Sequence, residues 1–518
     1  ARRLPYFCAG CPHNRSTVVP EGSEAQAGIG CHFMASWMNR HTGSLIQMGG
    51  EGVNWVAKSR FTGGGHIFQN LGEGTWFHSG SLAIRQAIAA GANINYKILF
   101  NDAVAMTGGQ PVDGRITVPG LVAQLRAEGV HTIAVLGPDP AVWHRHDFPH
   151  GVDFRHRDDL DAVQRELREV PGVTALVYDH ACATETRRKR KRGLAPPVGT
   201  RLLINEAVCE GCGDCGVQSN CVAIQPQDTA LGRKRRIDQG ACNADYSCLQ
   251  GFCPSFVGVQ GARLRRTVAP AEPFAERLAA LEQPLAVPLD RVHGLLLAGV
   301  GGTGVVTVGA LVAMAAHLEG KGSAVLDFTG FAQKGGSVLS YVRIARSPAE
   351  IHQVRIDRGA ADALVACDLL VGTDPRTLTV LGRERTRVLA NSFETPGGDF
   401  VLSPDADMAI PARIARLREA VGNARVGVLD ATRLAERLCG DAVFANVLML
   451  GCAWQLGMVP VSGSALDRAI ALNGAAVEGN RRAFGWGRLA AVDPHWVLAQ
   501  AGLEERPPRA QPLEALIR

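Results

Sequence analysis

The spacing of its cysteines constrains this chain more than any other feature. Residues 209–253 contain seven of the 14 cysteines, and Cys209, Cys212 and Cys215 follow one another in a C-x2-C-x2-C motif. Small secreted domains joined by disulfides have evenly spread cysteines, whereas tight groups two residues apart are typical of metal ligands. The spacing therefore predicts a small domain organised by metal, in a protein of the reducing cytoplasm.

The same region matches the pattern of bacterial-type ferredoxins, which carry two 4Fe-4S clusters. In that pattern the fourth cysteine of each half ligates the other cluster. One cluster is therefore expected to bind Cys209, Cys212, Cys215 and Cys253. The alternative is a zinc ribbon, but that site needs two C-x2-C pairs and leaves three of the cysteines over.

The second cluster has a carboxylate where a fourth thiolate is expected. Its cysteines are Cys221, Cys242 and Cys248, and the position midway between the last two is Asp245. A carboxylate is a harder donor than a thiolate and should hold iron less firmly. We predict either an Asp-ligated cluster or a 3Fe-4S cluster at this set. The alternative is that Asp245 only caps a turn.

A further group of cysteines lies near the N-terminus, where Cys8 and Cys11 form a C-x2-C pair and Cys31 follows after a loop. A c-type haem attachment site is excluded because a proline separates Cys11 from His13. The residues alone leave two alternatives open. One is an iron-sulfur cluster, and the other is a zinc site completed by His13 or His32.

An acidic residue between two glycines, Glu73, is followed 28 positions later by Asn101, directly after the predicted strand 96–100. Thiamine diphosphate enzymes share such a signature. Its glycines let the backbone approach the diphosphate, and the acid and amide oxygens bind Mg2+, which prefers oxygen ligands. The alternative is an ordinary strand-turn-helix in which the glycines only permit a tight turn.

Length and composition describe a soluble multidomain protein. A chain of 518 residues is too long for one hydrophobic core, and its 46% apolar and 20% charged residues are ordinary for a globular protein. We find no apolar stretch of about 18 residues and no signal peptide, so we expect a cytoplasmic protein. The net charge of +5 is mild, but basic residues cluster at 187–192 and 233–236. We interpret these runs as docking surfaces for an acidic electron carrier rather than for nucleic acid.

Two sections have an α/β pattern. Residues 120–130 have helical periodicity, and 131–137 and 173–180 are short apolar strands, which predicts a mainly parallel sheet. The second section begins at 292 with an apolar strand and a G-x-G-x-x-G motif whose glycines, followed by an acidic residue, are Gly299, Gly301, Gly304 and Asp327. This motif alone indicates a nicotinamide or flavin nucleotide site, and the alternative is close packing of strand and helix. Three isolated cysteines are predicted to be buried apolar side chains: Cys367, Cys439 and Cys452.

Together these segments resemble the 2-oxoacid:ferredoxin oxidoreductases, and among them the fused indolepyruvate ferredoxin oxidoreductases. Ten segments match in the family's order: "CAGCPHN", "GIGCHF", "QMGGEGVNW", "FQNLGEGT", "NDAVAMTGGQPVDG", "CEGCGDCGVQSNC", "GRKRRIDQ", "CLQGFCPSF", "GVGGTGVVTVGAL" and "GFAQKGG". The resemblance implies a multidomain α/β fold. Its parts are a parallel-sheet domain that binds thiamine diphosphate (1–195), a ferredoxin-like domain with two 4Fe-4S clusters (196–265), a linker (266–289) and a γ-type α/β domain with a C-terminal extension (290–518). The γ-type domain of that family does not bind a dinucleotide.

The resemblance also implies the site residues. The diphosphate and Mg2+ would be held by Gly72, Glu73, Gly74, Thr75, Asn101 and Ala103, with the Ala103 carbonyl as the third metal ligand. Cys8, Cys11 and Cys31 would ligate a proximal 4Fe-4S cluster beside the thiamine. Its fourth ligand would be Cys182, the only cysteine between positions 31 and 209.

The activity implied is thiamine-dependent oxidative decarboxylation of a 2-oxoacid, with an aryl pyruvate such as indolepyruvate favoured. Coenzyme A would take the acyl group, and three clusters would pass single electrons to ferredoxin. Alternatives are another 2-oxoacid (pyruvate, a branched-chain 2-oxoacid or 2-oxoglutarate), or an electron-transfer subunit without an active site. The activating glutamate is expected on a pyrimidine-binding domain, on another chain, another protomer or residues outside this numbering. A dimeric assembly is expected, with no nucleic-acid or membrane partner.

Overall fold

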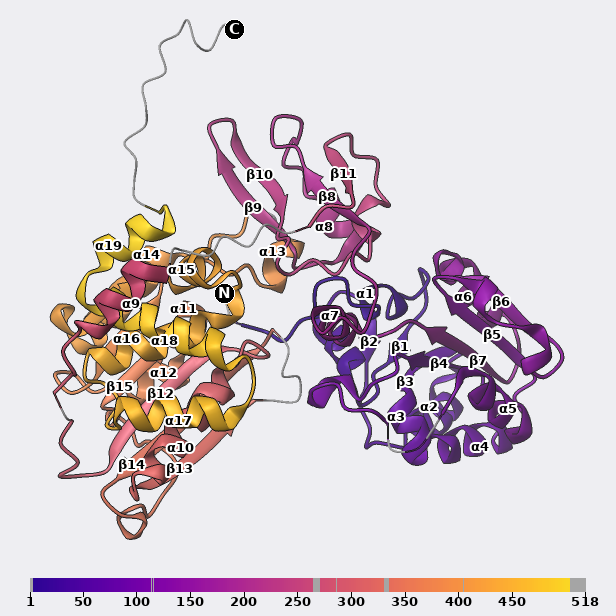
Figure 1. The fold of residues 1–518 in the computed structure, drawn as a ribbon. Helices are drawn as coiled ribbons and strands as arrows, with labels where there is room; N and C mark the ends of the chain where they lie inside the picture. Colours follow the sequence, from indigo (N-terminus) through magenta and orange to yellow (C-terminus); the bar gives the residue numbers. More distant parts are fainter. Residues whose placement is uncertain are drawn as a thin grey trace, which may run out of the picture.

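Two large sheets and two small two-stranded sheets make up the structure, a computed structural model (Figure 1). It describes residues 3–112, 114, 116–263, 271–285, 287–329, 335–403 and 405–503. Part of the expected linker, most of the "GFAQKGG" segment and the end of the C-terminal extension lie outside these residues. Within them, no helix is both long and apolar enough to cross a membrane.

The first large sheet has seven strands in the order β2-β1-β3-β4-β7-β5-β6, and every neighbouring pair is parallel. Its strands are β1 (Ala25–Gln26), β2 (Thr42–Gly43), β3 (Ile67–Gly72), β4 (Ile94–Phe100), β5 (Thr132–Gly137), β6 (Val152–His156) and β7 (Val173–Asp179). All seven residues of the central strand β4 are buried. Parallel strands covered on both faces read as continuous rather than alternating apolar runs, so the predicted parallel sheet is confirmed.

Helices cover this sheet and connect its strands. They are α1 (His13–Ser16), α2 (Val53–Thr62), α3 (Glu73–Thr75), α4 (Ser81–Ala89), α5 (Val118–Glu128), α6 (Leu160–Arg168) and α7 (Ala183–Lys191). The α5 helix shows local signals at both ends. The Thr117 side chain accepts the N–H of Gly120, and Gly129 ends the helix in a left-handed conformation. Its apolar face packs on the sheet through Leu121 and Leu125, which are fully buried.

The small unit between the large sheets consists of two antiparallel strand pairs, β8 with β11 and β9 with β10. Its elements are β8 (Thr200–Ile204), α8 (Asp214–Ser219), β9 (Ile224–Thr229), β10 (Gly232–Ile237) and β11 (Phe256–Gln260). Its apolar core is small, with only Leu202, Ile224 and Ile237 buried beside cysteines. A unit of this size needs further cross-links for stability, which the predicted iron-sulfur clusters would supply.

The second large sheet is mixed, in the order β13-β14-β12-β15-β16-β17. Its strands are β12 (His293–Val300), β13 (Gly322–Phe328), β14 (Ser337–Ala345), β15 (Ala363–Ala366), β16 (Arg387–Asn391) and β17 (Val426–Leu429). The antiparallel strand β14 lies between β12 and β13, and the β12-β15-β16-β17 part is parallel. The G-x-G-x-x-G segment joins β12 to α10. A Cβ at Gly299 would lie 2.6 Å from Cγ2 of Val305, so this glycine permits close strand-to-helix packing.

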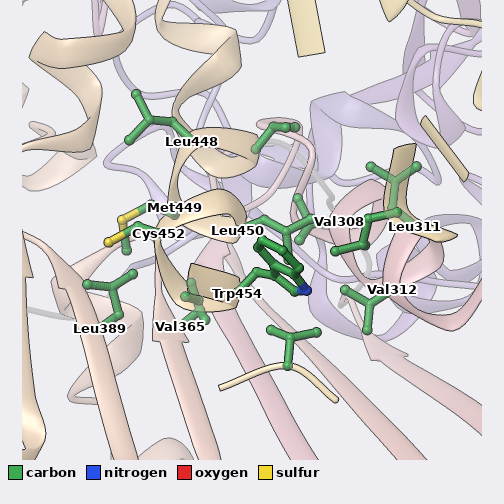
Figure 2. Close-up of a cluster of buried hydrophobic side chains, with 14 of the residues drawn as sticks. Val308, Leu311, Val312, Val365, Leu389, Leu448, Met449, Leu450, Cys452 and Trp454 are labelled. Carbon is green, nitrogen blue, oxygen red and sulfur yellow. The ribbon is translucent and has the colours of Figure 1, made fainter. Parts of the chain in front are cut away.

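Helices pack on both faces of this sheet. They are α9 (Ala271–Ala279), α10 (Val305–Leu318), α11 (Leu369–Gly372), α12 (Pro375–Val380), α13 (Gly398–Leu402), α14 (Ile410–Val421), α15 (Ala431–Cys439), α16 (Ala445–Gln455), α17 (Gly463–Asn473), α18 (Val477–Val492) and α19 (Pro494–Ala501). Figure 2 shows Leu450 and Trp454 of α16 among side chains of α10 and of the sheet. Cys452 is buried in this core, and Cys367 and Cys439 pack against it, in agreement with the prediction of apolar roles.

An N-terminal arm connects the two large sheets. Arg3 forms a buried ion pair with Asp368 at 2.5 Å, and its carbonyl accepts the N–H of Ser337 at the start of β14. Three residues later, the Tyr6 hydroxyl donates to Asn220 of the small unit. The chain then enters the first cysteine pair, so the arm contacts all three parts of the molecule.

The α16 and α18 helices cross at glycines, and this contact makes a stability prediction. A Cβ at Gly487 would overlap the Leu448 carbonyl and lie 2.8 Å from the backbone nitrogen of Cys452. Gly487→Ala should therefore destabilise the domain by about 1–3 kcal/mol, because helix backbone cannot yield. The measurement is the midpoint of thermal unfolding, with Gly65→Ala as the control, since a Cβ there meets nothing within 4 Å. An unchanged midpoint for Gly487→Ala would contradict the tight crossing.

Candidate functional site

Glu73 lies where β3 ends and α3 begins, and it is 2% exposed. Its Oε1 accepts the backbone N–H groups of Asn101 and Ala103 at 3.0 and 3.1 Å. Burial raises the pKa of Glu73 to about 7, although these two donors lower it. The carboxylate is therefore held at a fixed point by the loop that follows the neighbouring strand β4.

Asn101 supplies a second oxygen from that loop. Its Oδ1 is buried and has no hydrogen-bond partner, which leaves an acceptor whose burial is costly unless a ligand satisfies it. The next residue, Asp102, has a φ of +58°, a conformation that non-glycine residues rarely adopt. Such strain is typical of loops that place ligand-binding groups. A carboxylate, an orphan amide oxygen and a glycine-flanked backbone fit Mg2+ and a diphosphate.

The four N-terminal candidate cysteines lie together around one cavity. Cys8 and Cys11 precede α1, Cys31 begins the 3-10 helix η1 (Cys31–Trp37), and Cys182 is the N-cap of α7. The pKa of the Cys11 thiol is held well above its ordinary value by burial and by the thiols of the other three. Asn101 lines the same cavity, and its carbonyl accepts the Cys182 N–H at 3.0 Å. The cysteine set and the oxygen ligands are therefore neighbours.

These thiols fit a cluster better than a single ion. Among the residues that the structure describes, no group of three or more His, Cys, Asp or Glu side chains is arranged to hold one metal ion. A mononuclear zinc site brings four ligand atoms within about 2.3 Å of one point. A cluster instead places several irons between its thiolates, which matches side chains that surround a shared cavity. The shared cavity fits a cluster, and for both cysteine-rich regions the choice between clusters and zinc stays a prediction.

The cysteines of the small unit separate into the two predicted sets. Burial raises the pKa of Cys215 to about 11, and further increases come from its neighbours Cys209, Cys212 and Cys253. Cys212 is exposed. The sequence-distant Cys253 thus lies with the C-x2-C-x2-C motif, as the crossed ligand pattern requires.

The second set lies against the first domain. Burial raises the pKa of Cys221 to about 11, with further contributions from Cys242 and Asp245. Burial raises the pKa of the Cys248 thiol to about 12, and the neighbouring thiols of Cys221 and then Cys242 raise it further. The N–H of Gly10, between the first two cysteines of the chain, donates to the Cys221 thiol. The loop of the proximal cysteines therefore contacts the second set directly.

Asp245 has partners on both carboxylate oxygens. Its Oδ1 accepts from Nη1 of Arg157 at 2.6 Å, and its Oδ2 accepts from the Ser247 hydroxyl. The Asp245 and Arg157 side chains are only 10% and 13% exposed, so this ion pair is largely buried. Iron ligation by Asp245 stays a prediction. In the structure, this carboxylate forms an ion pair with the Arg157 guanidinium of the first domain.

The basic run 187–192 forms the second half of α7 and its C-cap, Arg192. Four of its residues are exposed: Arg188, Lys189, Lys191 and Arg192. Arg187 and Arg190 donate to backbone carbonyls of the small unit, and Lys191 pairs with Asp441 of the second large domain at 2.6 Å. Three side chains of the run therefore connect parts of this chain, and docking of an external carrier on its exposed residues stays a prediction.

The second basic run, 233–236 on β10, also faces another part of the chain. Arg235 is 2% exposed and lies over the Phe400 ring, 5.1 Å from its centroid. Arg233 donates to the Ala406 carbonyl. Arg235 is thus buried against the second large domain and is not part of an exposed docking surface, while docking on the rest of the run stays a prediction.

Sequence reasoning did not identify two buried groups near the site. Glu51 is fully buried and accepts the N–H groups of Gly49 at 2.7 Å and of Ile29 at 3.3 Å. It stands between two glycines, as Glu73 does, and this shared Gly-acid-Gly pattern is the signal for it. His32 was considered only for zinc. Burial lowers its pKa to about 4, and its Nε2 has no partner among the described residues.

Residues 294–490 match the family model described as pyruvate ferredoxin/flavodoxin oxidoreductase. Residues 294–490 thus form a domain of that family, and the chain fits the 2-oxoacid:ferredoxin oxidoreductases. The matched residues comprise the second large sheet and its helices up to α18. The resemblance stated for the sequence is confirmed, and its γ-type domain corresponds to this match.

Curated relatives of this chain are subunits of indolepyruvate oxidoreductases. Subunit IorA of Pyrococcus horikoshii is 27% identical over 279 residues, which are 49% of this chain and 40% of that subunit. Subunit IorB of Methanothermobacter thermautotrophicus is 27% identical over 203 residues, which are 39% of this chain and 98% of that subunit. The chain thus spans less than half the length of the IorA relatives that it matches.

Among solved structures, this chain is similar to the γ subunit of a keto/oxoacid ferredoxin oxidoreductase from Geobacter sulfurreducens. The identity is 23%, with a TM-score of 0.28, and the match covers 38% of this chain and 98% of that subunit.

Proposed function

We propose that this chain carries out thiamine-dependent oxidative decarboxylation of a 2-oxoacid, with transfer of the acyl group to coenzyme A and of the electrons to ferredoxin. The observation that carries the proposal is that the predicted Mg2+ ligands lie next to the proximal cysteine set. The Glu73 and Asn101 oxygens stand beside four cysteines that share one cavity. An electron-transfer subunit without an active site would need the cysteines but not the buried oxygen ligands.

The residues that would hold the cofactor lie on one edge of the first sheet. Glu73 and Asn101 follow β3 and β4, which are adjacent and parallel, so their side chains meet at the carboxyl ends of the strands. Together with the Ala103 carbonyl they would bind Mg2+. Gly72, Gly74 and Thr75 would let the diphosphate approach the backbone, since a Cβ at Gly74 would meet nothing nearer than 3.7 Å. Bound thiamine diphosphate supplies the carbanion and the electron sink for decarboxylation.

The cysteine sets suggest a direction for the electrons. The proximal set is Cys8, Cys11, Cys31 and Cys182, and its loop contacts the second set through Gly10. The remaining set contains the exposed Cys212. Electrons would therefore leave through the set Cys209, Cys212, Cys215 and Cys253, and an external ferredoxin would dock over it.

Indolepyruvate or another aryl pyruvate is the proposed substrate, because the curated relatives are named indolepyruvate oxidoreductases. The activating glutamate is proposed to come from a pyrimidine-binding domain or subunit of the same enzyme, in a dimeric assembly. The finer substrate choice is tested by comparing turnover of indolepyruvate, phenylpyruvate, pyruvate and 2-oxoglutarate in the assembled enzyme.

The composition of the purified protein tests the proposal directly. Prepared without oxygen, the chain should contain about three iron-sulfur clusters, because eleven cysteines stand in three sets. It should also bind one thiamine diphosphate with Mg2+ in the presence of its partner domain. The measurements are iron, sulfide and zinc analysis together with calorimetric titration of the cofactor. Zinc in place of iron, or iron for a single cluster, would contradict the proposal. Clusters without cofactor binding would favour the electron-transfer alternative.

A further inference from the structure

Three arginines of the first domain bind one short segment of the small unit. Arg187 donates to the carbonyls of Gly240 and Ala241, and Arg190 donates to that of Asn243 at 3.1 Å. Arg157, in the 3-10 helix η6 (Arg157–Asp159), donates to the carbonyl of Asp245 at 2.8 Å and to its carboxylate at 2.6 Å. We call these residues the arginine cradle: Arg157, Arg187 and Arg190.

The segment held in this way, 240–245, has no helix or strand of its own. Its carbonyls therefore have no partners in a strand ladder, and the cradle donates to four of them, those of Gly240, Ala241, Asn243 and Asp245. Ala244 and Tyr246, on either side of Asp245, have φ values of +59° and +64°, which are unfavourable for side chains with a Cβ. The segment keeps this conformation because the cradle satisfies its carbonyls. The same segment carries Cys242 and Asp245 of the second cysteine set.

The other side of the segment touches the proximal set. Nδ2 of Asn243 donates to the Ala9 carbonyl at 2.7 Å, and a Cβ at Gly10 would lie 3.2 Å from Cβ of both Asn243 and Asp245. Two cradle residues lie on α7, whose N-cap is Cys182 of the proximal set. Arg187 and Arg190 are three positions apart and therefore share one face of that helix. One helix thus holds a proximal thiol at its start and the second set along its side.

We propose that the arginine cradle positions the second iron-sulfur cluster against the proximal cluster and raises the second cluster's reduction potential. The inference rests on the proposed function, in which Cys221, Cys242 and Cys248 hold a cluster. When this cluster accepts one electron from the reduced proximal cluster, its net charge falls by one. The three guanidinium groups stabilise that more negative state. Because the three arginines are at least half buried, salt screens them weakly.

The test is a redox titration of the full chain, purified without oxygen and followed by electron paramagnetic resonance. In Arg157→Gln, Arg187→Gln and Arg190→Gln the midpoint potential of one cluster should shift to more negative values, while the other two stay unchanged. The spin coupling between the proximal and second clusters should weaken in the same variants. Arg190→Lys keeps the charge but loses the planar fork, so it should restore most of the potential and less of the coupling.

Two matched controls separate the cradle from general charge effects. Arg192→Gln removes a charge from the exposed end of the same α7, and Arg155→Gln removes an exposed charge from β6, two residues before Arg157. Both should titrate like the wild type. Unchanged potentials and coupling in all three cradle variants would overturn the inference, as would equal shifts in the controls.

Iron analysis keeps this inference apart from the proposed function. A wild-type chain that contains fewer than three clusters would contradict the proposed function itself, before any variant is compared. The inference is supported if an Arg190→Gln protein folds but lacks only its second cluster, and if the Arg190→Lys protein contains that cluster. Hydrogen exchange of residues 240–248 gives a second readout, since exchange should rise in the cradle variants and stay unchanged in Arg192→Gln.

Discussion

Glu73→Ala should weaken binding of Mg2+ and thiamine diphosphate by on the order of 100-fold or more. Loss of groups that only orient a metal ligand costs about 10–100-fold in metal affinity, and Glu73 is proposed as a direct ligand. Its carboxylate is 2% exposed and held by two backbone N–H groups, so no neighbouring side chain takes its place. Calorimetric titration of the assembled enzyme with the cofactor and Mg2+ measures the loss.

The matched control is Glu169→Gln, whose side chain is 75% exposed in the same domain. It should bind the cofactor like the wild type. Glu73→Asp tests geometry, because it keeps the carboxylate but shortens its reach, and it should retain part of the affinity. Wild-type affinity in Glu73→Ala would remove Glu73 from the proposed site.

The raised pKa of Glu73 adds a pH dependence to this prediction. Without metal, burial holds the pKa at about 7, so the carboxyl is protonated below that pH and ionised above it. Protons then compete with Mg2+ as pH falls through about 7, and the affinity should drop about tenfold per pH unit below it. Above that pH the affinity should level off. Glu73→Ala should lack this dependence.

Asp245→Cys should convert the second cluster into an ordinary four-thiolate cluster. If Asp245 ligates iron, the wild type should lose one iron readily on oxidation and give a 3Fe-4S signal, because a carboxylate holds iron less firmly than a thiolate. The cysteine variant should keep all four irons under the same oxidation. Electron paramagnetic resonance and iron analysis before and after oxidation measure this difference, with the first cluster as an internal reference.

The ion pair with Arg157 supplies a second effect of changing Asp245. Asp245→Ala leaves a largely buried guanidinium without its carboxylate, which should destabilise the docking of the small unit by about 3 kcal/mol. Asp228→Asn is the control, since that carboxylate of the same unit is 79% exposed. A destabilised Asp245→Ala protein with the wild-type cluster signal and iron retention would show that Asp245 serves only as the partner of Arg157.

The site could be predicted from the sequence where spacing reflects local geometry. Cys209, Cys212 and Cys215 surround a tight loop, so their motif implies a common ligand. Glu73 and Asn101 could be paired because each follows a strand of one parallel sheet, where the ends of neighbouring strands meet. In both cases the chemistry depends on contacts that a few residues determine.

Contacts between domains could not be predicted in this way. Arg157 lies 88 positions from Asp245, and no pattern along the chain connects them. The contacts of the basic runs could not be predicted for the same reason: a cluster of charges in a sequence does not reveal which face it covers. Arg235, buried over Phe400, appears in the sequence like any surface arginine. The antiparallel strand β14 in the second sheet was missed because apolar runs do not encode strand direction.

The contact between Gly10 and the segment 243–245 bears on the order in which this protein matures. The proximal loop covers the second cysteine set from one side, and the arginine cradle donates hydrogen bonds to its segment from the other. An iron-sulfur carrier protein needs direct access to thiolates to hand over its cluster. Cys212 offers such access in the assembled chain, but Cys221 lies beneath the proximal loop. If the second set holds a cluster as proposed, its part-buried thiols are covered by neighbours on two sides, and we expect cluster delivery to be fastest before the domains close on it.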